Sequence, residues 1–435
     1  MKFSYGKIFL LGFGFFGVSV IWGVYNAFVP IFLANKFGLE AAFIGFFMTL
    51  DNIAALFIQP PVGAWSDRLR TPIGRRLPFI LIGAPVTALA FGLIPLAAVL
   101  PLFVACTSTL LLSAALWRTP VVALMPDVTP SEKRSQANGI INFMGGIGTI
   151  IALQTGGMLY ELSPAFPFWL GSVLVVIAAL IVFLFIREPK EYEQSNEPQP
   201  SMLASLREIL ADTDKSGARL LFAIFFWFLG YSALETFFTL YAQEHLGIGP
   251  GDGATLLSIF PLFFVLFAIP SGFIAARIGR RVAISIGLIV VSLILALFYL
   301  LPAGRLLAPI SPLPLVGIPL TEDGPRMLTM AGLMLIFGGI GWAFVNINSL
   351  PMVVELTTAA RLGTFTGLYY LFSTLSAIVG PNINGWAIQL TGNNYNVIML
   401  IAPFFMLTAL VLMLGVRRGE ATVDQRSPLP IGREA

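Results

Sequence analysis

Long apolar runs, separated by short polar loops, make up most of this chain. A helix needs about 20 apolar residues to cross a bilayer, and we count twelve runs of about that length. They lie at about residues 8–33, 41–63, 78–99, 101–125, 138–160, 166–187, 219–243, 253–276, 281–303, 327–352, 363–390 and 394–416. The apolar–polar alternation of a membrane β-barrel is absent from them. The sequence therefore predicts an all-α membrane protein with twelve transmembrane helices.

Charged residues are scarce and unevenly placed. They are 11% of the chain, against about 25% in soluble domains. Of 25 lysines and arginines, Lys36, Arg305 and Arg326 fall in one set of loops and Arg118 falls inside a run, which leaves 21 for the other loops and the tails. Basic residues gather on the cytoplasmic side of membrane proteins. We therefore expect an integral plasma (inner) membrane protein with both termini in the cytoplasm.

Several other classes of protein are disfavoured. The net charge of +3 is spread over membrane-flanking loops, so no nucleic-acid partner is expected. Cys106 is the only cysteine, which excludes an internal disulfide. No nucleophile elbow, metal-ligand cluster or phosphate loop is present, so we predict no enzyme, no metal and no cofactor. The expected partners are the bilayer, a small molecule and a proton, and the expected state is a monomer.

The most distinctive motif is a charged loop between the second and third runs. The residues that define the motif are, in chain order, Gly63, Asp67, Arg68, Gly74, Arg75 and Arg76. We expect Gly63 to allow close helix packing, Gly74 to support a turn, and Asp67 to pair with an arginine or a helix end. A shorter copy occupies residues 272–281, between two later runs. This repetition after half a chain indicates a duplicated bundle with a structural, gating role for the loop.

A second repeat links the fourth and fifth runs to the tenth and eleventh. Asp127 and Glu355 are 228 residues apart, as are Thr129 and Thr357. Glu355 is therefore predicted to play the inner-loop role of Asp127. The repeats predict two pseudo-symmetric six-helix bundles, at 1–187 and 219–418, with a cytoplasmic linker at 188–218 that includes a short amphipathic helix, and a tail at 419–435.

Three ionisable residues fall near the middle of predicted spans: Asp51, Arg118 and Glu235. Each costs about 2.5–3.5 kcal/mol at the centre of a bilayer on insertion scales, so such groups face the bundle interior or a water-filled cavity. Asp51 is the candidate counter-charge of Arg118, and Asp51 and Glu235 are the candidate proton-coupling groups. The alternatives are a structural hydrogen bond for Asp51 and snorkelling to the surface for Arg118.

Aromatic and amide side chains at helical spacing are candidates for binding a polar ligand. With Arg118, the predicted substrate-binding set is Trp22, Tyr25, Asn26, Asn142, Asn346, Asn348, Tyr369 and Tyr370. An unpaired amide in lipid costs a few kcal/mol, which favours an inward position for Asn26. For Trp22, lipid-facing or core packing is the alternative. Asn142 lies on a face of small and amide residues that can also serve helix packing.

These motifs resemble the major facilitator superfamily over the whole chain. The segments at 59–68 and 74–80, Arg118 in the fourth run, and Asp127 after Pro126 are similar to those of the sucrose- and glycoside-type sugar:cation symporters. The resemblance implies that Arg118 is required for sugar transport. Two positions depart from that family. Thr107 stands where plant sucrose carriers have a proton-binding aspartate, and Ala55 stands where melibiose-type carriers have a second aspartate on the second helix.

The sequence thus predicts a secondary transporter that works by alternating access. The first hypothesis is proton-coupled symport of a neutral sugar or glycoside, for example a disaccharide such as sucrose or maltose. The second is proton-driven efflux of small apolar or amphipathic compounds, which predicts a cavity rich in aromatic residues and poor in amides. A non-transporting receptor or scaffold is a third, but it gives no reason for charges at mid-membrane depth.

Overall fold

The computed structural model describes residues 4–130, 133–188, 202–314, 317–321, 324–356 and 362–419. The first helix group comprises α1 (Tyr5–Ile31), a π-helical turn η1 (Phe32–Lys36), α2 (Ala41–Phe47), α3 (Leu50–Arg68), α4 (Leu77–Leu93), a 3-10 turn η2 (Ile94–Leu96), α5 (Leu100–Val128), α6 (Arg134–Leu162) and α7 (Phe166–Phe185). The second helix group comprises α8 (Met202–Ala211), α9 (Ser216–Tyr241), a π-helical turn η4 (Ala242–Leu246), α10 (Pro250–Ile278), α11 (Arg280–Leu300), α12 (Ala303–Leu306), α13 (Met330–Val354), α14 (Leu362–Leu390), a 3-10 turn η6 (Tyr395–Val397) and α15 (Ile398–Leu414).

The long helices are apolar enough to form a membrane protein. Within the described residues, eleven helical segments could cross a bilayer by length and composition. They match every predicted run except 363–390, which is helix α14. This helix carries Ser373, Ser376, Asn382 and Asn384, which lower its mean hydropathy. The prediction of a helical membrane protein is confirmed, while composition alone supports eleven spans rather than twelve.

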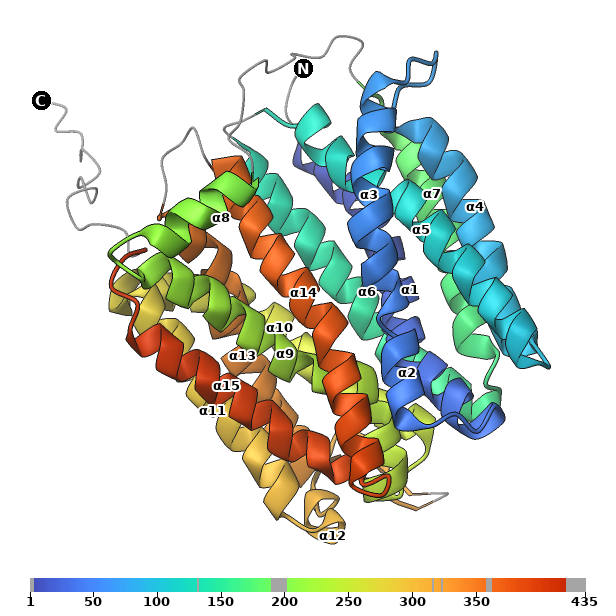
Figure 1. Ribbon diagram of the computed structural model, residues 1–435. Helices are drawn as coiled ribbons and strands as arrows, with labels where there is room; N and C mark the ends of the chain where they lie inside the picture. The colour runs from blue at the N-terminus through green and yellow to red at the C-terminus, as the bar shows by residue number, and fades with distance from the viewer. Residues whose placement is uncertain are drawn as a thin grey trace, which may run out of the picture.

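Packing within each helix group is extensive (Figure 1). In the first group α1 packs against α6 and α7, and α4 packs against α5 and α7. In the second group α10 and α11 pack against α13, and α9 packs against α14 and α15. The two groups meet through α6 with α10, α2 with α14, and α1 with α9.

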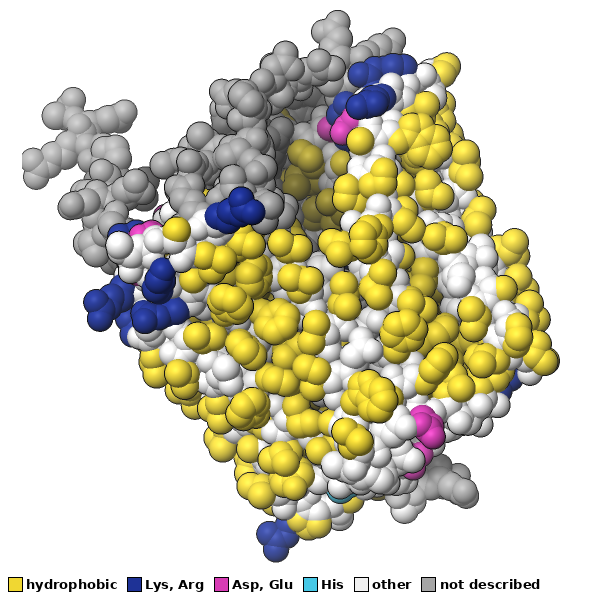
Figure 2. Space-filling view, viewed as in Figure 1, with side chains coloured by type: hydrophobic (Ala, Val, Ile, Leu, Met, Phe, Trp, Pro, Cys, Tyr) yellow, Lys and Arg dark blue, Asp and Glu magenta, His cyan; other side chains and the backbone are white. Residues whose placement is uncertain are grey.

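Basic side chains distinguish the two ends of the helices. The basic end carries Arg75, Arg76, Arg280 and Arg281, and the opposite end carries Lys36, Arg305 and Arg326. Between them, the face seen in Figure 2 is covered largely by hydrophobic side chains, with Lys and Arg mainly at its edges. That surface matches the apolar environment of a bilayer.

Contacts between the two helix groups gather at the opposite end. Asn35 and Gln243 exchange amide hydrogen bonds of 2.8 and 3.1 Å, and the Gly251 N–H donates to Glu161 Oε1 at 3.0 Å. At Gly45, the backbone of α14 leaves no room for a methyl group. Further hydrogen bonds between the two groups join Asn26 to Glu235 and Thr239 to Ala27 in the middle of the helices, and Ser258 to Gln154 and Gln389 to Glu40 nearer the opposite end. The helix groups are therefore joined at the opposite end.

A small sheet lies in the connection between α12 and α13 and moves the start of the predicted tenth span. Strands β1 (Pro309–Pro312), β2 (Ile318–Pro319) and β3 (Arg326–Thr329) form an antiparallel sheet in the order β1-β3-β2, between α12 and α13. The predicted tenth span began at 327 because Met327 and Leu328 are apolar. These residues pair with β1 and β2 instead, and α13 begins at Met330, where the Thr329 hydroxyl accepts from the Gly332 N–H.

Candidate functional site

Three mid-helix charges converge from both helix groups. Arg118 on α5 interacts electrostatically with Asp51 on α3 and with Glu235 on α9. The two carboxylates also interact electrostatically with each other. The structure therefore brings the three ionisable residues singled out in the sequence into one charge cluster, which contains two acids and one base.

Each carboxylate of this charge cluster is held by a neighbouring amide. Asn26 on α1 donates from Nδ2 to Glu235 Oε1 at 3.2 Å, a contact that joins the two helix groups. Asn52 donates from Nδ2 to Asp51 Oδ1 at 2.8 Å. The half-buried Arg118 makes no ion pair with any residue that the structure describes. Its donors are thus available to a ligand, as a fixed cation near two fixed anions.

The charge cluster faces a hollow rather than lipid. Glu235 is exposed although its partners on α1, α3 and α5 surround it. Tyr370 on α14, which also interacts with Arg118, is 57% exposed. Because these side chains point toward the interior and are still exposed, water or a ligand can reach them. In Figure 2 the surface is recessed beside the basic end of α3.

Aromatic rings line both sides of this region. Tyr231, one turn before Glu235 on α9, stacks on Trp342 of α13 with ring centroids 4.5 Å apart and planes 6° apart. Trp22 and Tyr25 meet edge to face at 5.5 Å, and Tyr25 interacts electrostatically with Asp51. The Tyr25 hydroxyl is buried, and no described residue bonds to it. Trp342 was missed as a site residue, although its position one turn before Asn346 was a usable signal.

Tyr369 and Tyr370 differ in position, and only Tyr370 lies where a ligand could reach it. Their rings meet edge to face at 5.3 Å, but Tyr369 is buried and its hydroxyl lies 3.1 Å from Ser349 Oγ. Tyr369 therefore packs α14 against α13, and Tyr370 faces the hollow.

Two of the four predicted amide ligands donate to their own helix. Asn142 donates to the Asn138 carbonyl at 2.8 Å, and Asn348, only 3% exposed, donates to the Phe344 carbonyl at 2.9 Å. An asparagine on a helix can reach the carbonyl four residues earlier, which competes with ligand binding. Asn346 is half-buried. Of the four amides, Asn26 alone contacts the charge cluster, through Glu235.

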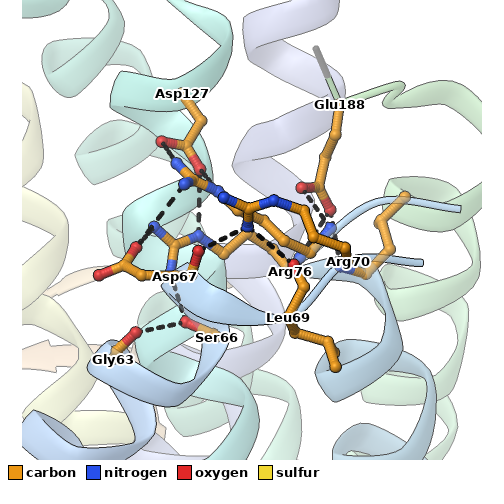
Figure 3. Close-up of polar contacts among 10 residues, drawn as sticks. Gly63, Ser66, Asp67, Leu69, Arg70, Arg76, Asp127 and Glu188 are labelled. Atoms are coloured by element: carbon orange, nitrogen blue, oxygen red, sulfur yellow. Dashed lines mark hydrogen bonds and ion pairs between the residues drawn. The ribbon is translucent and has the colours of Figure 1, made fainter. Parts of the chain in front are cut away.

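The basic end holds a second polar site, which we call the arginine network (Figure 3). Asp127 accepts from Arg75 Nη2 at 2.7 Å and from Arg76 Nε at 3.0 Å. Arg76 also donates to Asp67 Oδ1 at 2.5 Å and to the Ser66 hydroxyl. Arg76 and Asp127 are largely buried, with side chains 5% and 12% exposed. The predicted pairing of Asp67 with an arginine is thus present.

Glu188 is a member of the arginine network that the sequence analysis assigned to the linker. Its carboxylate accepts from the backbone N–H groups of Arg75, Arg76 and Leu77 at 2.8–2.9 Å, so it caps the N-terminus of α4. Gly74 has φ +122°, and a methyl group there would lie 2.5 Å from Glu188 Oε1. The turn predicted at Gly74 is therefore also the place where this carboxylate approaches the backbone.

Two other loop residues have weaker roles than expected. A methyl group at Gly63 would make only an ordinary contact of 3.5 Å with Thr119, so close packing does not require glycine in this conformation. Arg68 is exposed.

The second copy of the loop has a simpler pairing: Arg280 Nη1 lies 3.1 Å from Glu355 Oε1, with side chains 26% and 39% exposed. Glu355 thus occupies the place predicted from Asp127, in a pair that is more exposed.

Comparison with known proteins identifies the family. The family model of the Major Facilitator Superfamily matches residues 11–381. The chain belongs to this superfamily. It is an integral membrane transporter of a small molecule, and not an enzyme.

The similar proteins differ from the sugar carriers that the motifs resemble. The chain is 23% identical to Multidrug resistance protein 2 of Bacillus subtilis, with 92% of this chain and 91% of the relative covered. It is 24% identical to the class E tetracycline resistance protein of Escherichia coli, with 89% and 91% covered. These relatives do not support the narrower assignment to sucrose-type symporters.

Solved structures agree on the fold. The nucleoside transporter NupG (D323A mutant) matches with a TM-score of 0.72 at 18% identity, covering 94% of this chain and 100% of that one. A bacterial homologue of the human lysosomal transporter Spinster, in an inward-facing and unoccupied conformation, matches with a TM-score of 0.68 at 14% identity and covers 94% of both chains.

Proposed function

We propose that this transporter exports small amphipathic compounds in exchange for protons. The observation that carries the proposal is the charge cluster: two carboxylates and one unpaired guanidinium face a hollow bordered by aromatic rings. Asp51 and Glu235 are the proton-coupling groups in this proposal, and Arg118 is the fixed cation between them.

The net charge of the charge cluster explains how proton movement is coupled to substrate movement. With Asp51 and Glu235 ionised, Arg118 neutralises one negative charge and the other remains. One proton, or one cationic substrate, restores neutrality at a depth where uncompensated charge is costly. A proton and a cationic substrate therefore compete for the same carboxylates, and each favours the conformation in which it can enter or leave. Competition of this kind produces exchange rather than symport.

The lining favours aromatic and apolar substrates. Trp22, Tyr370 and Tyr231, which stacks on the buried Trp342, offer aromatic surface. Stacking on such faces, and the attraction of cations to them, supplies affinity without a fixed set of hydrogen bonds. Asn348 is buried and bonded to its own helix, so it does not offer its amide to a sugar, and the exposed Asn142 already uses its Nδ2 group within its own helix. The names of the relatives, multidrug and tetracycline resistance proteins, agree with this class of substrate.

In the proposed transport cycle, the two helix groups rock against each other as two bundles. We assign twelve spans, with α14 as the eleventh, and bundles at 1–187 and 219–418 joined by a linker. The charge asymmetry supports a cytoplasmic position for the basic end and for both termini. The described conformation is then inward-facing in a monomer of the inner membrane, because the groups are hydrogen-bonded at the opposite end.

Sugar symport is the second candidate, and Arg118 is the reason to keep it. A half-buried guanidinium without an ion pair suits a ligand rich in acceptor oxygens. This candidate predicts proton entry together with a disaccharide.

Purified protein in proteoliposomes, with a pH-sensitive dye inside, separates the two candidates. We expect an amphipathic aromatic cation such as ethidium to release protons from vesicles loaded with acid, and sucrose and maltose to have no effect. Glu235→Gln and Asp51→Asn should abolish the ethidium-dependent signal. Proton movement with a disaccharide and none with ethidium would overturn the export proposal in favour of symport.

A further inference from the structure

Two hydrogen bonds in the middle of the helices join α1 of the first helix group to α9 of the second. Asn26 donates from Nδ2 to Glu235 Oε1 at 3.2 Å. The Thr239 hydroxyl donates to the Ala27 carbonyl at 2.7 Å. Asn26 directly precedes Ala27, and Glu235 lies one turn before Thr239, so the two bonds are neighbours on both helices. We call this pair of bonds the central tie.

The position of the central tie matters for movement between the two groups. Other bonds between them, such as those of Asn35 with Gln243, lie at the opposite end, and an outward-facing conformation has to break them. A contact at mid-depth lies close to the axis about which two bundles rock. It is strained most while the groups turn, so it affects how fast they turn more than which end is open.

The two bonds of the central tie differ in chemistry. Thr239 and Ala27 are 1% and 2% exposed, and their bond joins two neutral groups, so its strength does not depend on pH. Asn26 is half-buried and Glu235 is exposed to the hollow, where its carboxylate can take up a proton. A hydrogen bond to an ionised acceptor is about twice as strong as one to a neutral acceptor. Only the bond from Asn26 therefore responds to the charge of Glu235.

The other ionisable groups near Glu235 act on it through charge alone. In the described chain, they are Asp51 on α3, Arg118 on α5 and Tyr231 on α9, while Tyr25 on α1 interacts with Asp51 and Tyr370 on α14 interacts with Arg118. Among the described side chains, Asn26 is the hydrogen-bond donor to Glu235. The charge of Glu235 is thus passed to the first helix group by a directed bond at Asn26.

We propose that Asn26 is a positioning residue that slows the turning of the empty carrier, and that a proton on Glu235 speeds it. With Glu235 ionised, the charge-assisted bond resists the relative movement of α1 and α9. With Glu235 protonated, the bond is weaker and the groups turn faster. This role rests on the proposed exchange of substrate for protons, because an exchanger that turns while empty lets its substrate leak back. Asn26 is then not a substrate ligand.

Single-molecule fluorescence on the full chain in proteoliposomes measures the turning rate without any substrate. Dyes are attached at the exposed ends of α3 and α10, through Arg68→Cys and Arg277→Cys in a Cys106→Ser background. We expect turning to be about tenfold faster at acidic than at alkaline pH, because a hydrogen bond to a charged group is replaced by one to a neutral group. Asn26→Leu keeps the volume but removes the donor, so it should turn fast at both pH values.

Thr239→Val is the matched control, since it removes the neutral bond of the central tie. It should turn faster than the native chain at every pH but keep the native ratio of acidic to alkaline rates. Glu235→Gln, whose side chain stays neutral, should turn fast at both pH values, and it supports the test if Asn26→Leu does not fold. A native ratio in either Asn26→Leu or Glu235→Gln would overturn the proposal, as would loss of the ratio in Thr239→Val.

Transport of ethidium separates this proposal from the proposed function. If turning depends on pH as described but ethidium moves no protons, export fails and the role of Asn26 stands. If the native chain exchanges ethidium for protons and Asn26→Leu leaks ethidium without proton movement, both stand. A native ratio of protons to ethidium in Asn26→Leu would leave export intact and overturn the role of Asn26.

Discussion

The two charged loops at the basic end share a sequence pattern but are stabilised differently. At the loop of residues 63–76, Asp127 pairs with Arg75 and Arg76, and Glu188 caps α4. The side chains of Arg76 and Asp127 are nearly buried. In the loop at residues 272–281, Arg280 pairs with Glu355 at the surface. A buried pair loses much stability when one partner is removed, whereas an exposed pair contributes little.

This difference bears on how the protein can move. The arginine network ties α3, α4, α5 and the end of α7 into one unit through Asp67, Asp127 and Glu188. In the second loop, Arg280 pairs with Glu355 at the end of α13 and Arg281 donates to the Leu414 carbonyl of α15, and the acid of this loop is more exposed than Asp127. We therefore expect the first helix group to behave as the more rigid body at the basic end, and four substitutions test that expectation.

The largest effect is expected for Asp127→Asn. The change keeps the shape of the side chain but removes the buried anion shared by Arg75 and Arg76, 11% and 5% exposed, and leaves them the more exposed Asp67. Breaking a buried ion pair in this way costs about 3 kcal/mol. The free energy of unfolding in mixed detergent micelles measures it. A loss no larger than that of Glu355→Gln, the variant of the exposed pair, would show that burial does not make the first loop the stronger one.

Sequence reasoning predicted the parts of this molecule that strong energetic rules enforce. Asp51, Arg118 and Glu235 had to avoid lipid, and they do meet inside the protein. The equivalence of Asp127 and Glu355 followed from a repeat of fixed spacing, and in the structure each of these acids pairs with an arginine. These placements depend on residue type and depth, which can be read from a sequence.

Other features depend on which of several possible partners a group contacts, and a sequence does not reveal this. Asn142 and Asn348 bond to their own helices, because the carbonyl four residues earlier is as good an acceptor as a ligand. Glu188 was missed because its partners are backbone N–H groups 111–113 residues away, which leave no residue pattern. Strand β3 looked like the start of a span because its apolar residues continue into α13.

The second largest effect is expected for Gly74→Ala, at about 2 kcal/mol. A non-glycine residue at φ +122° is strained, and its methyl group would collide with Glu188 Oε1. Gly279→Ala is the control, since Gly279 has φ +95° in the second loop. Chemical denaturation of both variants should show the larger loss at Gly74. Equal losses would mean that backbone strain alone acts, and that the contact with Glu188 adds nothing.

A smaller effect, about 1 kcal/mol, is expected for Glu188→Gln. The amide keeps one acceptor for the N–H groups of Arg76 and Leu77, but it loses the negative charge at the α4 N-terminus and the acceptor for Arg75. Because this charge is partly screened by salt, the loss should shrink as ionic strength rises. Thermal unfolding at low and high salt checks this. A salt-independent loss would point to a purely steric role.

The smallest effect is expected for Glu355→Gln, which breaks the exposed pair with Arg280. Side chains 26% and 39% exposed keep most of their hydration when separated, so the loss should stay below about 1 kcal/mol. This variant is the matched partner of Asp127→Asn, since each removes one charge from the acid of one loop. If the two loops differ as argued, transport by Glu355→Gln should also stay near the native rate, while Asp127→Asn slows it by weakening the first rigid unit. A Glu355→Gln protein as unstable as Asp127→Asn would mean that exposure does not decide the strength of these pairs.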